Sequence, residues 1–237
     1  MDSLVRCLKF LFGVLLLPAC VAATVVFSRD VLSVLKTEYH FFAGLVAYLA
    51  LLGIFQQPIR TYVFGHELTH ALWVWICGGR VKKFSATASG GGVRADKANA
   101  LIYLAPYFFP IYSILLIPLF LLTDFFFPIP GGMRILAALL GFTWAFHITF
   151  TIYVLFQGQP DIGATGAVFS LPLIYFANVV ALACLVIFVS PAVTYGGFFA
   201  DLWSGIRDTY RFLFDHAPAF LRSCSDWCRS RIEDVIG

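Results

Sequence analysis

Two histidines and a glutamate lie close together in the chain and form the pattern H-E-x-x-H, with His66, Glu67 and His70 at its defined positions. On a helix, residues four apart stand one turn apart on the same face, so the two imidazoles face the same way. This spacing is typical of zinc hydrolases, in which both histidines bind the metal and the glutamate accepts a proton from a water molecule. We therefore predict that His66 and His70 are Zn²⁺ ligands and that Glu67 is a catalytic general base.

A catalytic zinc usually has three protein ligands, so the chain should supply one more. After His70 the only glutamate is Glu233, in the C-terminal tail, which nearly excludes a glutamate as the third ligand. Between positions 98 and 200 the acidic, basic and histidine residues are Asp124, Arg134, His147 and Asp161.

Asp161 is the preferred third ligand among these residues. It follows Gln159-Pro160 at the end of a long apolar run, where an unwound backbone can aim a carboxylate between helices. The alternative is an ordinary turn aspartate. His147 lies in the middle of an apolar run, where it could ligate the metal directly, support the ligands, stabilise an oxyanion, or simply pack against a neighbouring carbonyl. We predict Asp161 as the third metal ligand and His147 as a catalytic residue.

The composition is that of a membrane protein: 60% of the residues are hydrophobic, 12% are charged, and the mean hydropathy is +0.87. The net charge of +3 is too small and too scattered to indicate nucleic-acid binding. The six cysteines show neither a C-x-x-C pair nor zinc-finger spacing. Cys224 and Cys228 could pair only in an oxidising compartment, and two unpaired thiols are the simpler interpretation.

Successive apolar runs predict an all-α polytopic membrane protein with about six transmembrane helices. The runs cover 8–27, 40–55, 60–77, 98–122, 133–156 and 168–193. The run at 98–122 contains Pro106 and Pro110, so it should be kinked or broken. We divide the chain into N-terminal transmembrane helices (1–59), a catalytic transmembrane core (60–193) and an amphipathic interfacial tail (194–237) of helices lying on lipid. A short interfacial helix is expected around Lys36 and Glu38.

The most polar internal stretch, 79–97, predicts a β-hairpin with a turn at three consecutive glycines, Gly90 to Gly92. Its edge could pair with an extended substrate, or the stretch could be a plain basic loop. Five Lys and Arg residues in it favour the cytoplasmic side. Three predicted spans separate it from Arg6 and Lys9, which places the N-terminus outside unless one early run does not cross.

The order of these features resembles the site-2 protease family of intramembrane zinc metalloproteases, over roughly residues 60–180. The resemblance lies in H-E-x-x-H within a span, the Gly-Gly-Arg-Val-Lys-Lys-Phe sequence directly after it, two further spans and then Pro160-Asp161. It implies a three-helix core, zinc held by His66, His70 and Asp161, Glu67 as general base, a hairpin that steers substrate, and a site nearer the cytoplasmic face.

The chain departs from that family at the third-ligand segment. The usual Asn-x-x-Pro followed by Leu-Asp-Gly is replaced here by a segment running from Gln157 to Gly163, and no PDZ-like domain is inserted. The polar role of the missing asparagine could fall to Gln157, Gln159 or Thr151.

We predict an intramembrane zinc metalloprotease that cleaves transmembrane proteins or peptides, is surrounded by membrane lipid, binds no nucleic acid and resides in a bacterial inner membrane. Three alternatives remain open at this stage. An inactive relative would bind client proteins without cutting them, a zinc hydrolase could act on a lipid, and a transporter could use histidine and aspartate as an ion relay. The absence of paired half-repeats disfavours the transporter.

Overall fold

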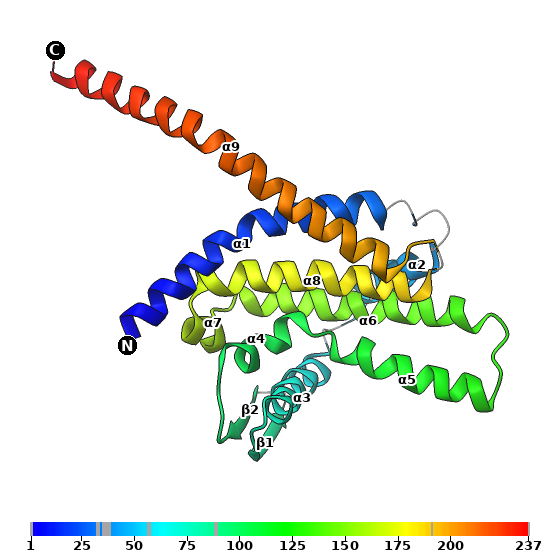
Figure 1. Ribbon diagram of the computed structural model, residues 1–237. Coiled ribbons are helices and arrows are strands. Elements are labelled where there is room, and N and C mark those ends of the chain that lie inside the picture. Colours follow the sequence, from blue (N-terminus) through cyan, green and yellow to red (C-terminus); the bar gives the residue numbers. More distant parts are fainter. Residues whose placement is uncertain are drawn as a thin grey trace.

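The computed structural model describes residues 2–31, 34, 39–55, 58–87, 90–190 and 192–236. The predicted helix around Lys36 and Glu38 lies outside these residues. The described chain is almost wholly helical, with one antiparallel hairpin after the third helix (Figure 1). The elements are α1 (Asp2–Asp30), α2 (Tyr39–Ile54), α3 (Ile59–Ile76), β1 (Val81–Thr87), β2 (Gly90–Ala95), α4 (Ala100–Phe108), α5 (Ile111–Phe126), α6 (Gly132–Leu155), α7 (Pro160–Thr165), α8 (Ala167–Val189) and α9 (Tyr195–Ile236).

Three helices in the described chain are long and apolar enough to cross a membrane: Ser3–Asp30 within α1, α6 and α8. A fourth span results if α4 and α5 are counted together. These helices support a helical membrane protein, but the predicted number of six spans is not confirmed. The shortfall has two sources, because α2 has only 16 residues and because Arg60, His66, Glu67 and His70 lower the hydropathy of α3.

The predicted break in the fourth apolar run is confirmed. Helices α4 and α5 meet at an angle of 66°, with Phe109 in an extended conformation between them. Pro110 explains this geometry, since a proline disfavours the helical conformation of the residue before it. The break leaves α4 packed on α3, α7 and α8, whereas α5 pairs with α6.

The long helices pack at close range where glycine faces a neighbouring backbone. Helix α2 lies along α6, and a Cβ at Gly44 or Gly141 would overlap the backbone of the facing helix, at Ala138 and Phe41 respectively. Gly13 makes a similar approach to the backbone at Val168, where α1 lies along α8. Small residues that allow such approach are characteristic of helix packing in membranes.

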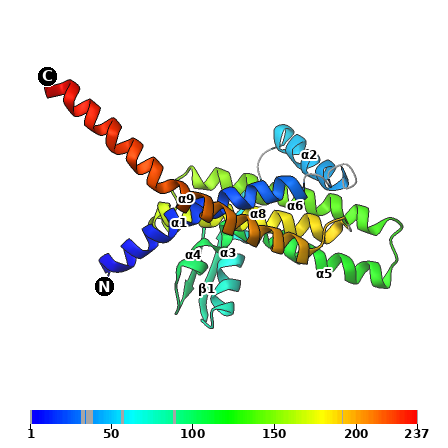
Figure 2. The ribbon, with the colours of Figure 1, turned by 45° about the horizontal axis from the view of Figure 1, so that its top comes forward.

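The C-terminal segment forms a single helix, α9, instead of the predicted separate helices, and it continues through Pro218. Its first part packs along α1: Arg29 forms an ion pair of 2.9 Å with Asp201, and Gly205 lies against Val26. The other end of α9 projects well beyond the bundle (Figures 1 and 2). The predicted position of this segment on a lipid surface stays a prediction.

The two basic segments lie near the same end of the bundle. Arg6 and Lys9 line a cavity together with residues 163–169, the link from α7 to α8. Lys82 and Arg94 of the hairpin line another cavity together with Asp161 of α7. The chain therefore leaves this end of the bundle after Lys9 and has returned to it at Lys82.

Candidate metal centre

Helix α3 places both histidines of the H-E-x-x-H pattern on one face. The Nε2 atoms of His66 and His70 are 3.2 Å apart, and the rings meet edge to face with centroids 4.8 Å apart. Thr69 donates a hydrogen bond of 2.8 Å to the carbonyl oxygen of Gly65 within the same turn. The two imidazoles therefore present adjacent nitrogens to one point in space.

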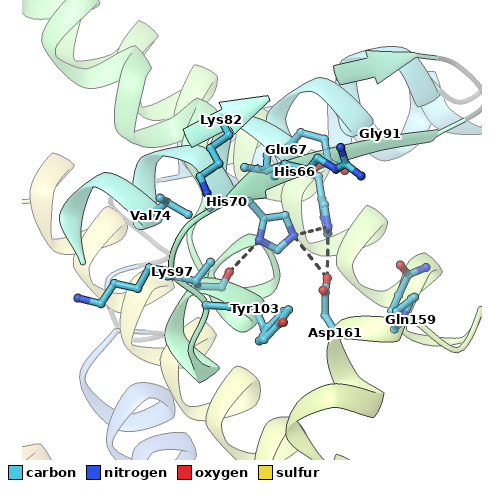
Figure 3. A pocket seen from close by; sticks show the side chains of 17 residues that line it. His66, Glu67, His70, Val74, Lys82, Gly91, Lys97, Tyr103, Gln159 and Asp161 are labelled. Carbon is cyan, nitrogen blue, oxygen red and sulfur yellow. Dashed lines mark hydrogen bonds and ion pairs between the residues drawn. The ribbon is translucent and has the colours of Figure 1, made fainter. Parts of the chain in front are cut away.

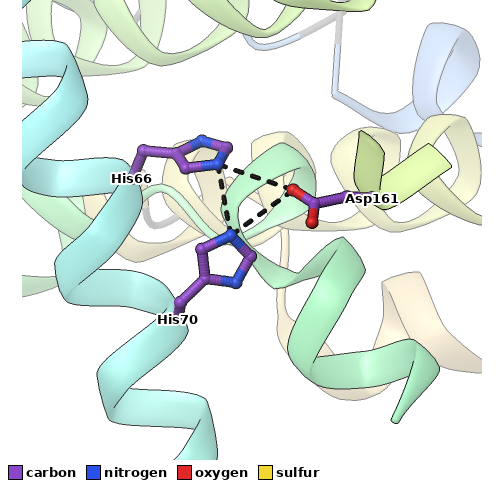
Figure 4. A group of neighbouring side chains, drawn as sticks. All are labelled: His66, His70 and Asp161. Atoms are coloured by element: carbon purple, nitrogen blue, oxygen red, sulfur yellow. Dashed lines mark hydrogen bonds and ion pairs between the residues drawn. The ribbon is translucent and has the colours of Figure 1, made fainter. Parts of the chain in front are cut away.

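Asp161 reaches the same point from α7, in the first turn after Gln159 and Pro160. Its Oδ2 atom lies 3.7 Å from His66 Nε2 and 3.4 Å from His70 Nε2 (Figure 4). The structure thus brings the predicted third ligand to the histidine pair across the 90 residues that separate His70 from Asp161.

The separations of the three donor atoms fit a single metal ion. A tetrahedral ion with bonds of about 2.0–2.1 Å to nitrogen and oxygen has ligand atoms about 3.3 Å apart, close to the observed 3.2, 3.4 and 3.7 Å. Within the described part of the chain, these residues form the one group of three or more His, Cys, Asp or Glu side chains placed to hold a metal. The residues can hold a metal; that they do so stays a prediction.

Hydrogen bonds orient both imidazoles for ligation through Nε2. His70 Nδ1 lies 2.8 Å from the carbonyl oxygen of Ile102, which can only accept, so Nδ1 carries the proton. His66 Nδ1 lies 3.0 Å from the hydroxyl of Tyr62. A histidine ligand is commonly held in this way by a partner at its other nitrogen.

A third hydrogen bond holds the carboxylate. The hydroxyl of Tyr107, on α4, donates to Asp161 Oδ2 over 2.9 Å. The Tyr107 side chain is completely buried. Asn178 of α8 donates 2.8 Å bonds to the carbonyl oxygens of Tyr107 and Ile174. Asp161 is therefore tied through α4 to the core of the bundle.

His147 lies apart from the three converging residues. Its Nε2 donates to Asn178 Oδ1 over 3.2 Å, so it joins the chain of contacts that leads through Asn178 to Tyr107. It also lines a small cavity with Tyr62 and His66. His147 is not a member of the metal-holding group, so the structure does not place it as a direct metal ligand. Its predicted catalytic role stays a prediction.

Glu67 is buried at the junction of two cavities of about 710 and 370 Å³. Both cavities are lined by His66, Glu67, Gly91 and Gln159. Figure 3 shows the larger cavity, with His66, His70 and Asp161 pointing toward one another on one side of it. Glu67 thus lines the same cleft as the metal-holding group, and its predicted role as a general base stays a prediction.

The remaining polar residues considered in the sequence analysis differ in whether they line this cleft. Gln159 lines both cavities and Gln157 lines the smaller one, whereas Thr151 is buried and its hydroxyl has no hydrogen-bond partner among the described residues. Asp124 accepts a 2.7 Å bond from the backbone of Ile129 in the α5–α6 turn, which is a structural role. The side chains of Cys224 and Cys228 lie outside the described residues.

Sequence reasoning missed the two tyrosines that contact His66 and Asp161. Tyr62 stands four residues before His66 and could have been found from helical spacing alone. Tyr107 could not, because nothing in the sequence pairs it with Asp161. Asn178 carried a weak signal, a polar side chain within an apolar run.

Comparisons with family models, curated proteins and solved structures find no match for this chain. The assignment of a function therefore rests on the chain's own geometry.

Proposed function

We propose that this protein is an intramembrane zinc metalloprotease, which hydrolyses peptide bonds in or near transmembrane segments. The observation that carries the proposal is the convergence of His66, His70 and Asp161, with Glu67 buried beside them, in a chain whose long helices suit a membrane. Two histidines and a carboxylate from the protein leave a further position open, which is the pattern of a catalytic zinc site.

The chemistry divides between the metal and Glu67. A bound zinc would act as a Lewis acid. It would polarise the substrate carbonyl and lower the pKa of a bound water molecule toward neutral pH. Glu67 orients the attacking water, accepts its proton and returns that proton to the leaving amine. Tyr62, Tyr107 and the carbonyl of Ile102 hold the ligand side chains in place throughout.

The hairpin supports a peptide as the substrate. Residues Gly91 to Ala95 of β2 line the larger cavity, so a backbone edge runs beside the candidate metal centre. An extended peptide can pair with such an edge through its main chain. A substrate helix must unwind first, since its peptide bonds are otherwise shielded by their own hydrogen bonds.

The arrangement of basic residues also supports an orientation. Arg6 and Lys9 gather with the hairpin near α7, and Lys and Arg are enriched on the cytoplasmic side of membrane proteins. We therefore place both the N-terminus and the cleft at the cytoplasmic face of a multi-pass protein, for which a bacterial inner membrane is our proposed location. This replaces the outside N-terminus expected from counting six spans.

A cleavage assay tests the proposal. Purified full-length protein, loaded with zinc in lipid vesicles, is incubated with a labelled transmembrane peptide or with labelled phospholipid, and products are identified by mass spectrometry. We expect peptide products from the wild type. Glu67→Gln should bind zinc normally but lose at least about a hundredfold in rate, the contribution usual for a general base. Equal cleavage by Glu67→Gln would exclude this mechanism, and products from lipid alone would indicate a lipid hydrolase.

A further inference from the structure

The two cavities that meet at Glu67 have different linings. The smaller one is lined by no described lysine or arginine, and half of its lining residues are apolar or aromatic: Ile59, Tyr62, Val63, Phe150, Tyr153 and Val154. The larger one is lined by three cations, Lys82, Arg94 and Lys97. We call these the apolar lobe and the basic lobe. A chain that runs through both lobes passes from a lobe without cations to one with three cations at the candidate catalytic glutamate.

An irregularity in the hairpin brings a second cation into the basic lobe. Val81 pairs with Ala95 and Lys83 pairs with Arg94, so two steps along β1 match a single step along β2. Lys82 is the extra residue of this β-bulge. Side chains alternate between the faces of a regular strand, whereas a bulge re-aims one of them. Lys82 and Arg94 consequently line the same cavity.

The positive charge of the basic lobe is not neutralised by neighbouring carboxylates. Within the described residues, no ion pair joins Lys82 or Arg94 to an acidic side chain. Lys97 donates to the carbonyl oxygen of Cys77, which leaves its charge in place. The acidic residues of the lobe are Glu67 and Asp161, which belong to the candidate catalytic centre.

We propose that the basic lobe selects substrates with acidic residues beside the cleaved bond. This inference rests on the proposed protease function and names its substrate class: a transmembrane protein whose apolar segment occupies the apolar lobe and whose adjoining extramembrane segment carries Asp or Glu. Charge complementarity of this kind contributes chiefly to specificity. A peptide fits better than an anionic lipid because residues of β2 line the lobe, and a strand edge pairs with an extended chain through its main chain.

Matched peptides test the selection. All peptides share one transmembrane segment and differ in one flanking segment, which is acidic (Asp and Glu), neutral (Asn and Gln) or basic (Lys and Arg). Each flank is placed at either end of the transmembrane segment in separate peptides. The zinc-loaded full-length protein in neutral vesicles should cleave the acidic peptide roughly threefold to tenfold faster than the neutral one, a range that two partly exposed charge pairs can supply. The double variant Lys82→Gln/Arg94→Gln should lose this preference, and Lys82→Glu/Arg94→Glu should favour the basic flank. Arg134→Gln, at the start of α6, removes an exposed cation elsewhere and should keep the wild-type preference.

Binding provides a second measurement that does not need turnover. Fluorescence anisotropy with Glu67→Gln should show tighter binding of the acidic peptide, weakened by salt and by Lys82→Gln/Arg94→Gln. Cleavage of all peptides at equal rates would overturn the selection while leaving the protease function standing. Absence of all cleavage would instead count against the protease function. The anisotropy measurement would then still show whether the basic lobe binds acidic peptides more tightly than neutral ones. Loss of that preference in vesicles containing anionic lipid would show that the lobe binds headgroups and would overturn the proposal.

Discussion

Gly91 of β2 lies directly against Glu67 of α3. A Cβ atom at position 91 would lie 2.5 Å from Glu67 Cγ and 2.7 Å from its Oε1, closer than side chains approach one another. The same position would also meet the backbone oxygen of Ser85 at 2.8 Å, so the strand has little room to shift. The glycine therefore lets a backbone edge and a candidate general base occupy the same wall of the cleft.

Gly91→Ala should consequently displace the Glu67 carboxylate or push β2 away from α3. We expect peptide cleavage to fall at least about tenfold, since small misplacements of a catalytic group are costly, while zinc binding is unchanged. Gly92→Ala is the matched control, because a Cβ at Gly92 meets nothing within 4 Å. The measurement compares the cleavage rate and the zinc content of the two variants. Full activity in Gly91→Ala would contradict the close contact.

Tyr107→Phe should weaken metal binding without changing the fold. The substitution removes only the hydroxyl that donates to Asp161 Oδ2. Loss of such a partner typically reduces metal affinity about 10–100-fold, which competition with a zinc chelator measures. Tyr175→Phe is the control, since it also removes a hydrogen-bonded hydroxyl, here 2.7 Å from Thr24 Oγ1. Equal zinc affinity in Tyr107→Phe and wild type would remove Tyr107 from the support of the site.

Gly141→Ala should destabilise the bundle even though alanine favours helix more than glycine does. A Cβ there would overlap the backbone at Phe41, forcing α2 away from α6. Overpacking of this kind typically costs about 1–3 kcal/mol, measured as a lower midpoint of thermal unfolding in detergent. Gly53→Ala meets nothing within 4 Å and should be neutral or slightly stabilising. Equal stability of the two variants would refute the close α2–α6 packing.

The sequence predicts those features that depend on local rules. Helical spacing brings His66 and His70 together, and proline chemistry breaks the chain at Pro110. The hairpin itself is confirmed, but the predicted turn at Gly90 to Gly92 is wrong, because these glycines belong to β2 and pair with β1. Elimination of other acidic residues identified Asp161, which the fold then places within reach of both histidines.

Other features depend on packing that no local pattern encodes. Tyr107 contacts Asp161 only because α4 and α7 meet in the bundle. Pro218 does not end α9. Phe214, whose carbonyl would lose its hydrogen-bond partner at Pro218, is 82% exposed. The predicted number of six spans is not confirmed, in part because α3 has helical length without the hydropathy of a span.

Zinc content of purified protein, measured by mass spectrometry of the metal, tests the central claim most directly. We predict one zinc per chain in the wild type, in Glu67→Gln and in His147→Ala, and loss of that zinc in His66→Ala and Asp161→Ala. A wild type without stoichiometric metal, or an Asp161→Ala variant that retains zinc while His147→Ala loses it, would contradict the metal centre described here.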